Sequence, residues 1–180
     1  MQSPLSSPKT LRFATLNVNC AKNNRSPFDL LEEIAKYITD NNIDILGLTE
    51  VDFLSETEAK DFKIDNYSTL VPKSNKKKVR VVGLVAKSLE RHIQIREDLA
   101  INEIPGIWFD LKLPRTRQYE LATVYREWGS GIEKSIPKQV ERIYTLEDKL
   151  MKVSRESSAV YIGGDWNLNG ARYDDNEWQL

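Results

Sequence analysis

Near its end the chain reads Tyr161-Ile162-Gly163-Gly164-Asp165-Trp166-Asn167. The residues from Ala159 to Ile162 predict a short buried strand, because β-branched and aromatic side chains suit a pleated surface. The two glycines let the backbone bend and let another group approach closely. Asp165 and Asn167 follow the carboxyl end of this strand, where ligands usually bind in open α/β sheets, and their spacing lets both side chains face one target. A polar turn would use the same residue types, so other segments must decide between a site and a turn.

The composition is that of one soluble globular domain. Of the 180 residues, 40% are hydrophobic and 29% are charged, which is enough apolar material for a core. The net charge of -1 indicates that any nucleic-acid contact must come from a local basic patch. Cys20 is the only cysteine, which excludes an internal disulfide and favours a reducing intracellular compartment, nuclear or cytoplasmic, over secretion. No apolar run approaches ~18 residues, so no membrane contact is expected.

The order of apolar and turn residues predicts alternating strands and helices. Residues 1–10 are typical of a disordered lead-in, and 11–180 of one domain. Strands are expected over 11–18, 43–48, 67–71, 79–86, 106–113, 119–125 and 159–162, and helices over 26–42, 55–62 and 137–153. The last helix carries Val140, Ile143, Leu146 and Leu150 on one face. The first strand, helix and strand predict a parallel pair of strands with a right-handed crossover.

Polar residues of similar character follow four of the predicted strands. They are Asn17 with Asn19, Glu50 with Asp52, Tyr125 with Arg126 and Glu127, and Asp165 with Asn167. Carboxylates with amides, and no clustered His or Cys, suit a hard oxygen-binding cation such as Mg²⁺. A zinc site and Ser/His/Asp catalysis are both disfavoured, since His92 and Cys20 are the only residues of their types. The alternative for Glu50 and Asp52 is an ordinary solvated strand end.

Five segments, in order along the chain, resemble the motifs of the endonuclease/exonuclease/phosphatase superfamily. They are Thr15–Asn19, Leu46–Glu50, Val81–Val85, Val124–Tyr125 and Ile162–Asn167. The resemblance implies an α/β sandwich in which two β-sheets lie face to face with helices outside. Within the superfamily, Tyr125-Arg126-Glu127-Trp128 and Asp174-Asp175 are more similar to the endonuclease domains of retroelement polyproteins than to base-excision enzymes.

The resemblance also implies a role for each matching residue. Glu50 would ligate Mg²⁺, for which Mn²⁺ could substitute, and Asn17 would hold Glu50 and the metal region in register. Asp165 would orient or deprotonate the attacking water. Asn167 and Tyr125 would contact the phosphate. The implied reaction is in-line hydrolysis of a phosphodiester, with the cation and fixed donors stabilising the added charge.

The implied partner is nucleic acid, specifically DNA, together with other domains of a polyprotein. Arg126, Lys76, Lys77, Lys78 and Arg80 are candidate nucleic-acid contacts, although a lysine run such as this one is also typical of a solvated hairpin tip. Two other functions remain open at this point. One is a phosphatase of small phosphoesters within the same superfamily, and the other is a non-catalytic remnant.

The chain departs from the superfamily pattern in three ways, one of which is Cys20 at a position where Gly is common. Asn19 stands where many relatives have Asp, which argues against a direct metal ligand at that position. The superfamily ends with a Ser-Asp-His segment whose histidine is central to catalysis, and nothing like it follows Asn167. The resemblance therefore covers Leu11 to Asn167, and the expectation is a C-terminally incomplete domain that is poorly active by itself.

Overall fold

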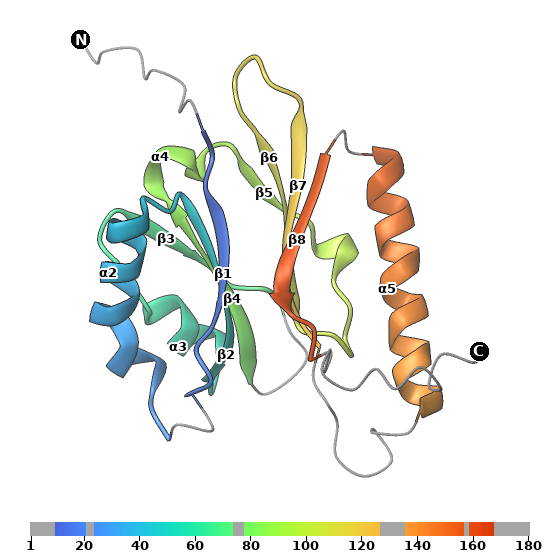
Figure 1. Cartoon of the computed structure of the whole chain (residues 1–180), viewed down its shortest axis with the longest axis horizontal. Helices are drawn as coiled ribbons and strands as arrows, with labels where there is room; N and C mark the ends of the chain where they lie inside the picture. The colour runs from blue at the N-terminus through green and yellow to red at the C-terminus, as the bar shows by residue number, and fades with distance from the viewer. Residues whose placement is uncertain (1–9, 21–23, 74–77, 127–135, 157–158, 168–180) are drawn as a thin grey trace, which may run out of the picture.

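Two four-stranded β-sheets pack face to face in the computed structural model, and the longer helices cover their outer faces (Figure 1). The structure describes residues 10–20, 24–73, 78–126, 136–156 and 159–167. The predicted two-sheet α/β sandwich is therefore confirmed. In these described ranges, no helix is both long and apolar enough to cross a membrane.

The first sheet has the strand order β1-β2-β4-β3. Its strands are β1 (Phe13–Asn17), β2 (Ile45–Phe53), β3 (Tyr67–Leu70) and β4 (Val79–Ala86). β1 and β2 are parallel, as predicted, and a short 3₁₀ turn, η1 (Pro27–Leu30), and helix α2 (Leu31–Asn41) form the crossover between them. Ser26 caps η1, and Ser55 caps the short helix α3 (Glu56–Asp61) that follows β2.

The second sheet has the strand order β5-β6-β7-β8. Its strands are β5 (Ile93–Ile95), β6 (Gly106–Lys112), β7 (Gln118–Tyr125) and β8 (Ala159–Asp165). β7 and β8 are parallel, and helix α5 (Ile136–Glu156) lies between them in the chain. The sequence patterns missed three short elements, α4 (Lys87–Glu90), β5 and η2 (Glu97–Leu99), which are too short to show a period.

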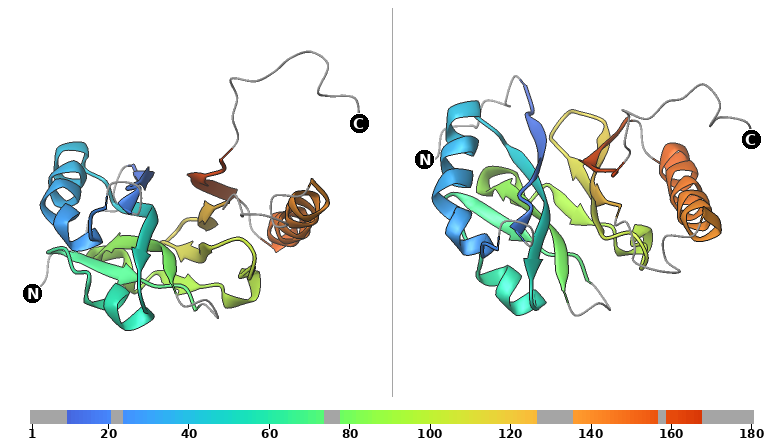
Figure 2. Two further views of the ribbon diagram at one scale, coloured as in Figure 1. Left: turned by 90° about the horizontal axis from the view of Figure 1, so that it is seen from below. Right: turned by 60° about the horizontal axis from the view of Figure 1, so that its bottom comes forward.

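The hydrophobic core has three layers, in agreement with the arrangement of α2 and α5 on opposite sides of the molecule (Figure 2). Ile34 and Ile38 of α2 pack on the outer face of the first sheet. The middle layer fills the space between the two sheets, and Leu146 and Val153 of α5 pack on the outer face of the second sheet. Two predicted apolar residues of α5, Val140 and Ile143, instead remain 37% and 48% exposed.

Polar residues replace Val140 and Ile143 on the buried side of the first turns of α5. Gln139 and Arg142 are buried there, and Gln139 Oε1 accepts a hydrogen bond of 3.0 Å from Arg126 Nη2. The helix therefore uses an apolar contact at one end and a polar contact at the other, which a purely hydrophobic period does not reveal.

Glycines let β8 lie close to the facing sheet and to its own neighbour β7 near their carboxyl ends. A Cβ atom on Gly163 would lie 2.5 Å from Cγ2 of Thr15 in the facing sheet. Gly164 has a φ of +141°, and a Cβ atom there would lie 1.8 Å from the carbonyl oxygen of Val124. These two positions require glycine, because a side chain would push β8 away from its neighbours.

Candidate active site

The carboxyl ends of β1, β2, β7 and β8 lie at one edge of the sandwich, which we call the rim. Parallel pairing places Asn17 beside Thr49 in one sheet and Tyr125 beside Asp165 in the other. β1 and β8 are edge strands that face each other across the sandwich (Figure 1). The four polar strand ends predicted from the sequence therefore do converge at one place.

Asn17 connects the two sheets at the rim. Its Nδ2 donates a 2.6 Å hydrogen bond to Asp165 Oδ2 and a 3.2 Å hydrogen bond to Glu50 Oε1. Its Oδ1 accepts a 2.9 Å hydrogen bond from the backbone amide of Asn19. Contacts at both ends fix the orientation of the amide, and one amide nitrogen thus holds two carboxylates from different sheets.

Asp165 is held from its other side by Asn167. The backbone amide of Asn167 donates a hydrogen bond of 2.9 Å to Asp165 Oδ1, so both carboxylate oxygens have fixed donors. The side-chain amide of Asn167 donates 2.7 Å to the backbone carbonyl of Arg126. The structure therefore brings Asn167 to the rim, and its contact with a phosphate stays a prediction.

The backbone at the rim is unusual as well as its side chains. Asn19, Glu50, Asp52 and Asn167 all have φ between 47° and 58°, in the left-handed region that non-glycine residues seldom adopt. Glu50 and Asp52 do so within β2, which continues to Phe53 past the end predicted at residue 48. Such conformations cost free energy and collect at functional sites, where the surroundings enforce a side-chain direction.

Tyr125 lies at the inner side of the rim, between the sheets, and is 5% exposed. Arg80 Nη2 donates a 3.1 Å hydrogen bond to its hydroxyl, and Arg80 Nε forms a 2.5 Å ion pair with Asp52 Oδ1. From their sequence positions, Tyr125, Arg80 and Asp52 were expected in three separate groups. The signal that could have joined them is a lone arginine in the apolar strand from Val79 to Ala86.

The other candidate nucleic-acid contacts have different surroundings. Arg126 is buried, and its Nη1 donates a hydrogen bond of 3.2 Å to the backbone carbonyl of Trp166. This bond connects Arg126 to the residue that follows β8. Burial first, and then the charge of Arg142, lower the pKa of Arg126. Lys78 is exposed. Outside the described residues lie Lys76, Lys77, Glu127, Trp128, Asp174 and Asp175.

The donor set at the rim fits a hard divalent cation such as Mg²⁺. In the part of the chain that the structure describes, neither Glu50 nor Asp165 forms an ion pair with Arg or Lys, so their charges are balanced only by hydrogen bonds. The described residues hold no cluster of three or more His, Cys, Asp or Glu side chains suited to a metal. A cation here would keep several water ligands, as Mg²⁺ usually does.

Cys20 and His92 take no part in this site as reactive groups. Cys20 is buried, and burial first, with the charge of Asp52 second, raises the pKa of its thiol to about 11, so it stays protonated at neutral pH. The backbone carbonyl of His92 accepts from Lys112, and Lys112 pairs with Gln118 at the start of β7. Since Tyr125 ends that strand, the only histidine of the sequence lies at the end of the sheet opposite the rim.

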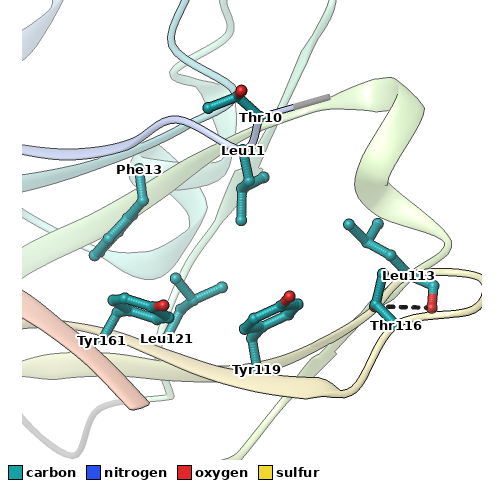
Figure 3. A pocket seen from close by; sticks show the side chains of 8 residues that line it. All are labelled: Thr10, Leu11, Phe13, Leu113, Thr116, Tyr119, Leu121 and Tyr161. Carbon is teal, nitrogen blue, oxygen red and sulfur yellow. Dashed lines mark hydrogen bonds between the residues drawn. The ribbon is translucent and has the colours of Figure 1, made fainter. Parts of the chain in front are cut away.

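A pocket of about 390 Å³ also opens at this opposite end of the sandwich (Figure 3). Leu11, just before β1, and Phe13, its first residue, face Tyr119, Leu121 and Tyr161 of the second sheet across it. Its remaining lining residues are Thr10, Leu113 and Thr116. The lining carries no charged side chain, so the pocket lacks the groups that a phosphate or a divalent cation needs.

Three solved structures share this fold. Danio rerio TDP2 complexed with single-strand DNA product has a TM-score of 0.60 and 15% identity, over 89% of this chain and 62% of that chain. The endonuclease domain of TRAS1, a telomere-specific non-LTR retrotransposon, has a TM-score of 0.58 and 15% identity, over 90% and 61%. An endonuclease/exonuclease/phosphatase family protein from Bacteroides thetaiotaomicron has a TM-score of 0.61 and 14% identity, over 91% and 66%.

The sequence itself is more distant from known proteins than the fold is. No protein-family model and no curated protein sequence matches it. The chain covers less than two thirds of the length of the TDP2 and TRAS1 structures, at 62% and 61%. The two sheets of this chain align with these structures over 89–91% of its length, and the chain has the fold of the endonuclease/exonuclease/phosphatase superfamily.

Proposed function

We propose that this chain is a divalent-cation-dependent phosphodiesterase that cleaves DNA, as an endonuclease domain of a retroelement polyprotein. The observation that carries the proposal is the amide of Asn17, which holds the carboxylates of Glu50 and Asp165 together at 3.2 and 2.6 Å. Two carboxylates that share one amide donor repel each other, and no described basic side chain is ion-paired with either of them. A cation and a phosphate are the ligands that this arrangement suits best.

Each residue of the rim would then have a separate task. Asp165 has both oxygens fixed by donors, so it can orient a water molecule and accept its proton. Glu50 would hold Mg²⁺, or Mn²⁺ in its place, with Asn17 keeping Glu50 in register, and the cation would supply charge stabilisation to the phosphate oxygens. Asn167 and Tyr125 would donate hydrogen bonds to the same phosphate as its charge increases.

Two observations support nucleic acid over a small phosphoester as substrate. Two of the structures with the same fold are a TDP2 complexed with a single-strand DNA product and a retrotransposon endonuclease domain. The described part of the basic segment after β3, Lys78, is exposed and directly precedes β4, the strand whose second residue is Arg80. A basic residue at this position, next to the pairing of Val79 with Phe53 at the end of β2, would meet the backbone of a polymer but would have no target in a small substrate.

We also expect the 180 residues to act slowly. A phosphodiester transition state carries added charge, and removing one well-placed donor typically lowers the rate by ~10²–10³. His92 is the only histidine, and it lies at the opposite end of the second sheet. Added imidazole should therefore accelerate the reaction, since it can supply the missing donor from solution.

Nicking of supercoiled plasmid in Mg²⁺ tests the proposal. The parent chain should nick slowly, and EDTA or Asp165→Ala should abolish nicking. Asp61→Ala is the matched control, because Asp61 is an exposed acid at the end of α3 and should have no effect. Cleavage that survives EDTA or Asp165→Ala, or no cleavage even with imidazole, would contradict the proposal. Phosphate release from inositol phosphates without nicking would move the substrate to small phosphoesters.

A further inference from the structure

Arg80 enters the space between the sheets through an irregularity in the first sheet. Thr49 pairs with Val81 and Phe53 pairs with Val79, so the three residues from Glu50 to Asp52 oppose Arg80 alone. This is a β-bulge, and such bulges redirect side chains beside active sites. Here the left-handed conformation of Asp52, with φ of 55°, accompanies an ion pair of 2.5 Å between Asp52 Oδ1 and Arg80 Nε.

The ion pair is largely removed from water. The side chains of Arg80 and Asp52 are 17% and 9% exposed. An arginine withdrawn from solvent loses hydration, which a carboxylate at close range offsets. Asp52 therefore holds the planar guanidinium in one orientation. A lysine has a compact ammonium on a flexible stem and lacks such a fixed set of donors.

The same guanidinium contacts Tyr125 of the facing sheet in two ways. Arg80 Nη2 donates 3.1 Å to the hydroxyl oxygen, and Arg80 Cζ lies 4.8 Å from the centre of the ring. A guanidinium has donors and no acceptor, so the hydroxyl oxygen must accept from it. The proton of the tyrosine is then directed to a different acceptor, away from Arg80.

We propose that Arg80, oriented by Asp52, is a positioning residue that makes Tyr125 a hydrogen-bond donor to a phosphate oxygen at the rim. The nature of the acceptor rests on the proposed function. Arg80 then acts through Tyr125 and has no direct contact with nucleic acid, which differs from the expectation drawn from the sequence. Asp52, in turn, serves Arg80 and leaves the cation to Glu50.

Nuclear magnetic resonance of the full chain with ¹³Cζ-labelled tyrosine tests the contact without any need for activity. Tyr125→Phe identifies the Tyr125 signal by its loss. Arg80→Met, Arg80→Lys and Asp52→Asn should each shift that signal, while the signal of Tyr119 stays in place as the matched control. Arg80→Lys retains the charge. A shift in this variant therefore shows that the planar N–H donors of the guanidinium, and not the charge alone, position the hydroxyl. An unchanged Tyr125 signal in all three variants would overturn the proposal.

A double-mutant cycle on plasmid nicking tests the consequence. Tyr125→Phe and Arg80→Met should each lower kcat by ~10–10² with little change in KM, and the double variant should be no slower than Tyr125→Phe. Losses that multiply, together with a raised KM for Arg80→Met, would show that Arg80 contacts the substrate itself and would overturn the proposal.

The two tests separate two kinds of failure. If the Tyr125 signal moves in the variants but no variant and no parent sample cleaves DNA, the proposed function fails while the contact stands. In that case a short single-stranded DNA oligonucleotide provides the remaining test. It should shift the Tyr125 signal of the parent and leave that of Arg80→Met unchanged, and equal responses would overturn the positioning role.

Discussion

Two groups of acids in this molecule differ in whether basic side chains form ion pairs with them. At the rim, Glu50 and Asp165 share one amide nitrogen of Asn17, with no described arginine or lysine paired to either. In the second group, four acids surround Arg96, which follows β5, and we call these residues the Arg96 cluster. They are Asp98, Asp110, Glu120 and Glu156, at 2.9, 3.5, 3.3 and 2.6 Å from its guanidinium nitrogens.

The Arg96 cluster is a structural device. It joins the edge of the second sheet to α5 through Glu156, and Lys152 of α5 adds an ion pair to Asp98. Arginine and lysine largely neutralise these acids, so they offer little to an added cation. In the described residues, Glu50 and Asp165 have hydrogen bonds but no ion pair with a basic side chain, which is the condition under which a cation or a proton transfer becomes useful.

Glu120 shows how far neutralisation goes in the Arg96 cluster. It is fully buried, and it is the cross-strand partner of Asp110. Glu120 Oε1 and Asp110 Oδ1 are both buried without a hydrogen-bond donor. Burial first, and then the neighbouring Asp110, raise the pKa of Glu120 to about 9. With its pKa raised this far, the Glu120 carboxyl keeps its proton at neutral pH and can donate it in a hydrogen bond to Asp110.

The largest expected effect comes from removing the arginine of this cluster. Arg96→Met should lower the free energy of unfolding by about 3–5 kcal/mol, because it leaves several partly buried acids without their main counter-charge. Urea denaturation measures the change. Arg91→Met is the matched control, since Arg91 is exposed and its loss should change the free energy by less than about 0.5 kcal/mol. Equal losses in the two variants would remove the structural role of Arg96.

The corresponding change at the rim should act on the reaction instead. Asn17→Ala removes the amide that holds Glu50 and Asp165, and the rate of plasmid nicking should fall by ~10²–10³. The free energy of unfolding should change by only about 1 kcal/mol, because Asn17 is exposed and water can replace its hydrogen bonds. A large loss of stability with an unchanged rate would reverse the contrast between the two groups.

A smaller effect is expected from pH. The pKa of Glu120 in the folded chain, about 9, lies above the ordinary Glu value, so the folded state binds more protons than the unfolded state between these two pH values. Its contribution to stability is therefore complete at low pH and is lost as the pH rises toward 9, with a slope of at most about 1.4 kcal/mol per pH unit.

Glu120→Gln should flatten this slope between the ordinary Glu pKa and about 9, since the amide keeps a donor toward Asp110 and does not titrate. Urea denaturation at a series of pH values measures the slope in both chains. Glu97→Gln is the control, because Glu97 is exposed. Identical slopes in the parent and Glu120→Gln would assign the loss of stability in this pH range to another group.

The sequence predicted the long elements of the fold and the convergence of the rim, because these depend on periodicity and on the rule that parallel strands end together. The sequence could not predict where β2 ends or the irregularity within it. Thr49 to Asp52 have the composition of a polar strand end, whereas a bulge carries the strand on to Phe53 and turns Asp52 toward Arg80. The Arg96 cluster was also missed, because its members are far apart in the sequence and carry no shared motif.

The central expectation is that a divalent cation binds at the rim and does not bind at the Arg96 cluster. Mn²⁺ tests this directly, since its unpaired electrons broaden the nuclear magnetic resonance signals of nearby groups. Titration of ¹⁵N-labelled chain should first broaden the side-chain amide of Asn17 and the backbone amides near Glu50 and Asp165, while the amides of Asp98 and Glu120 stay sharp. Broadening that begins at the Arg96 cluster, or that spreads evenly over the acidic surface, would contradict the account.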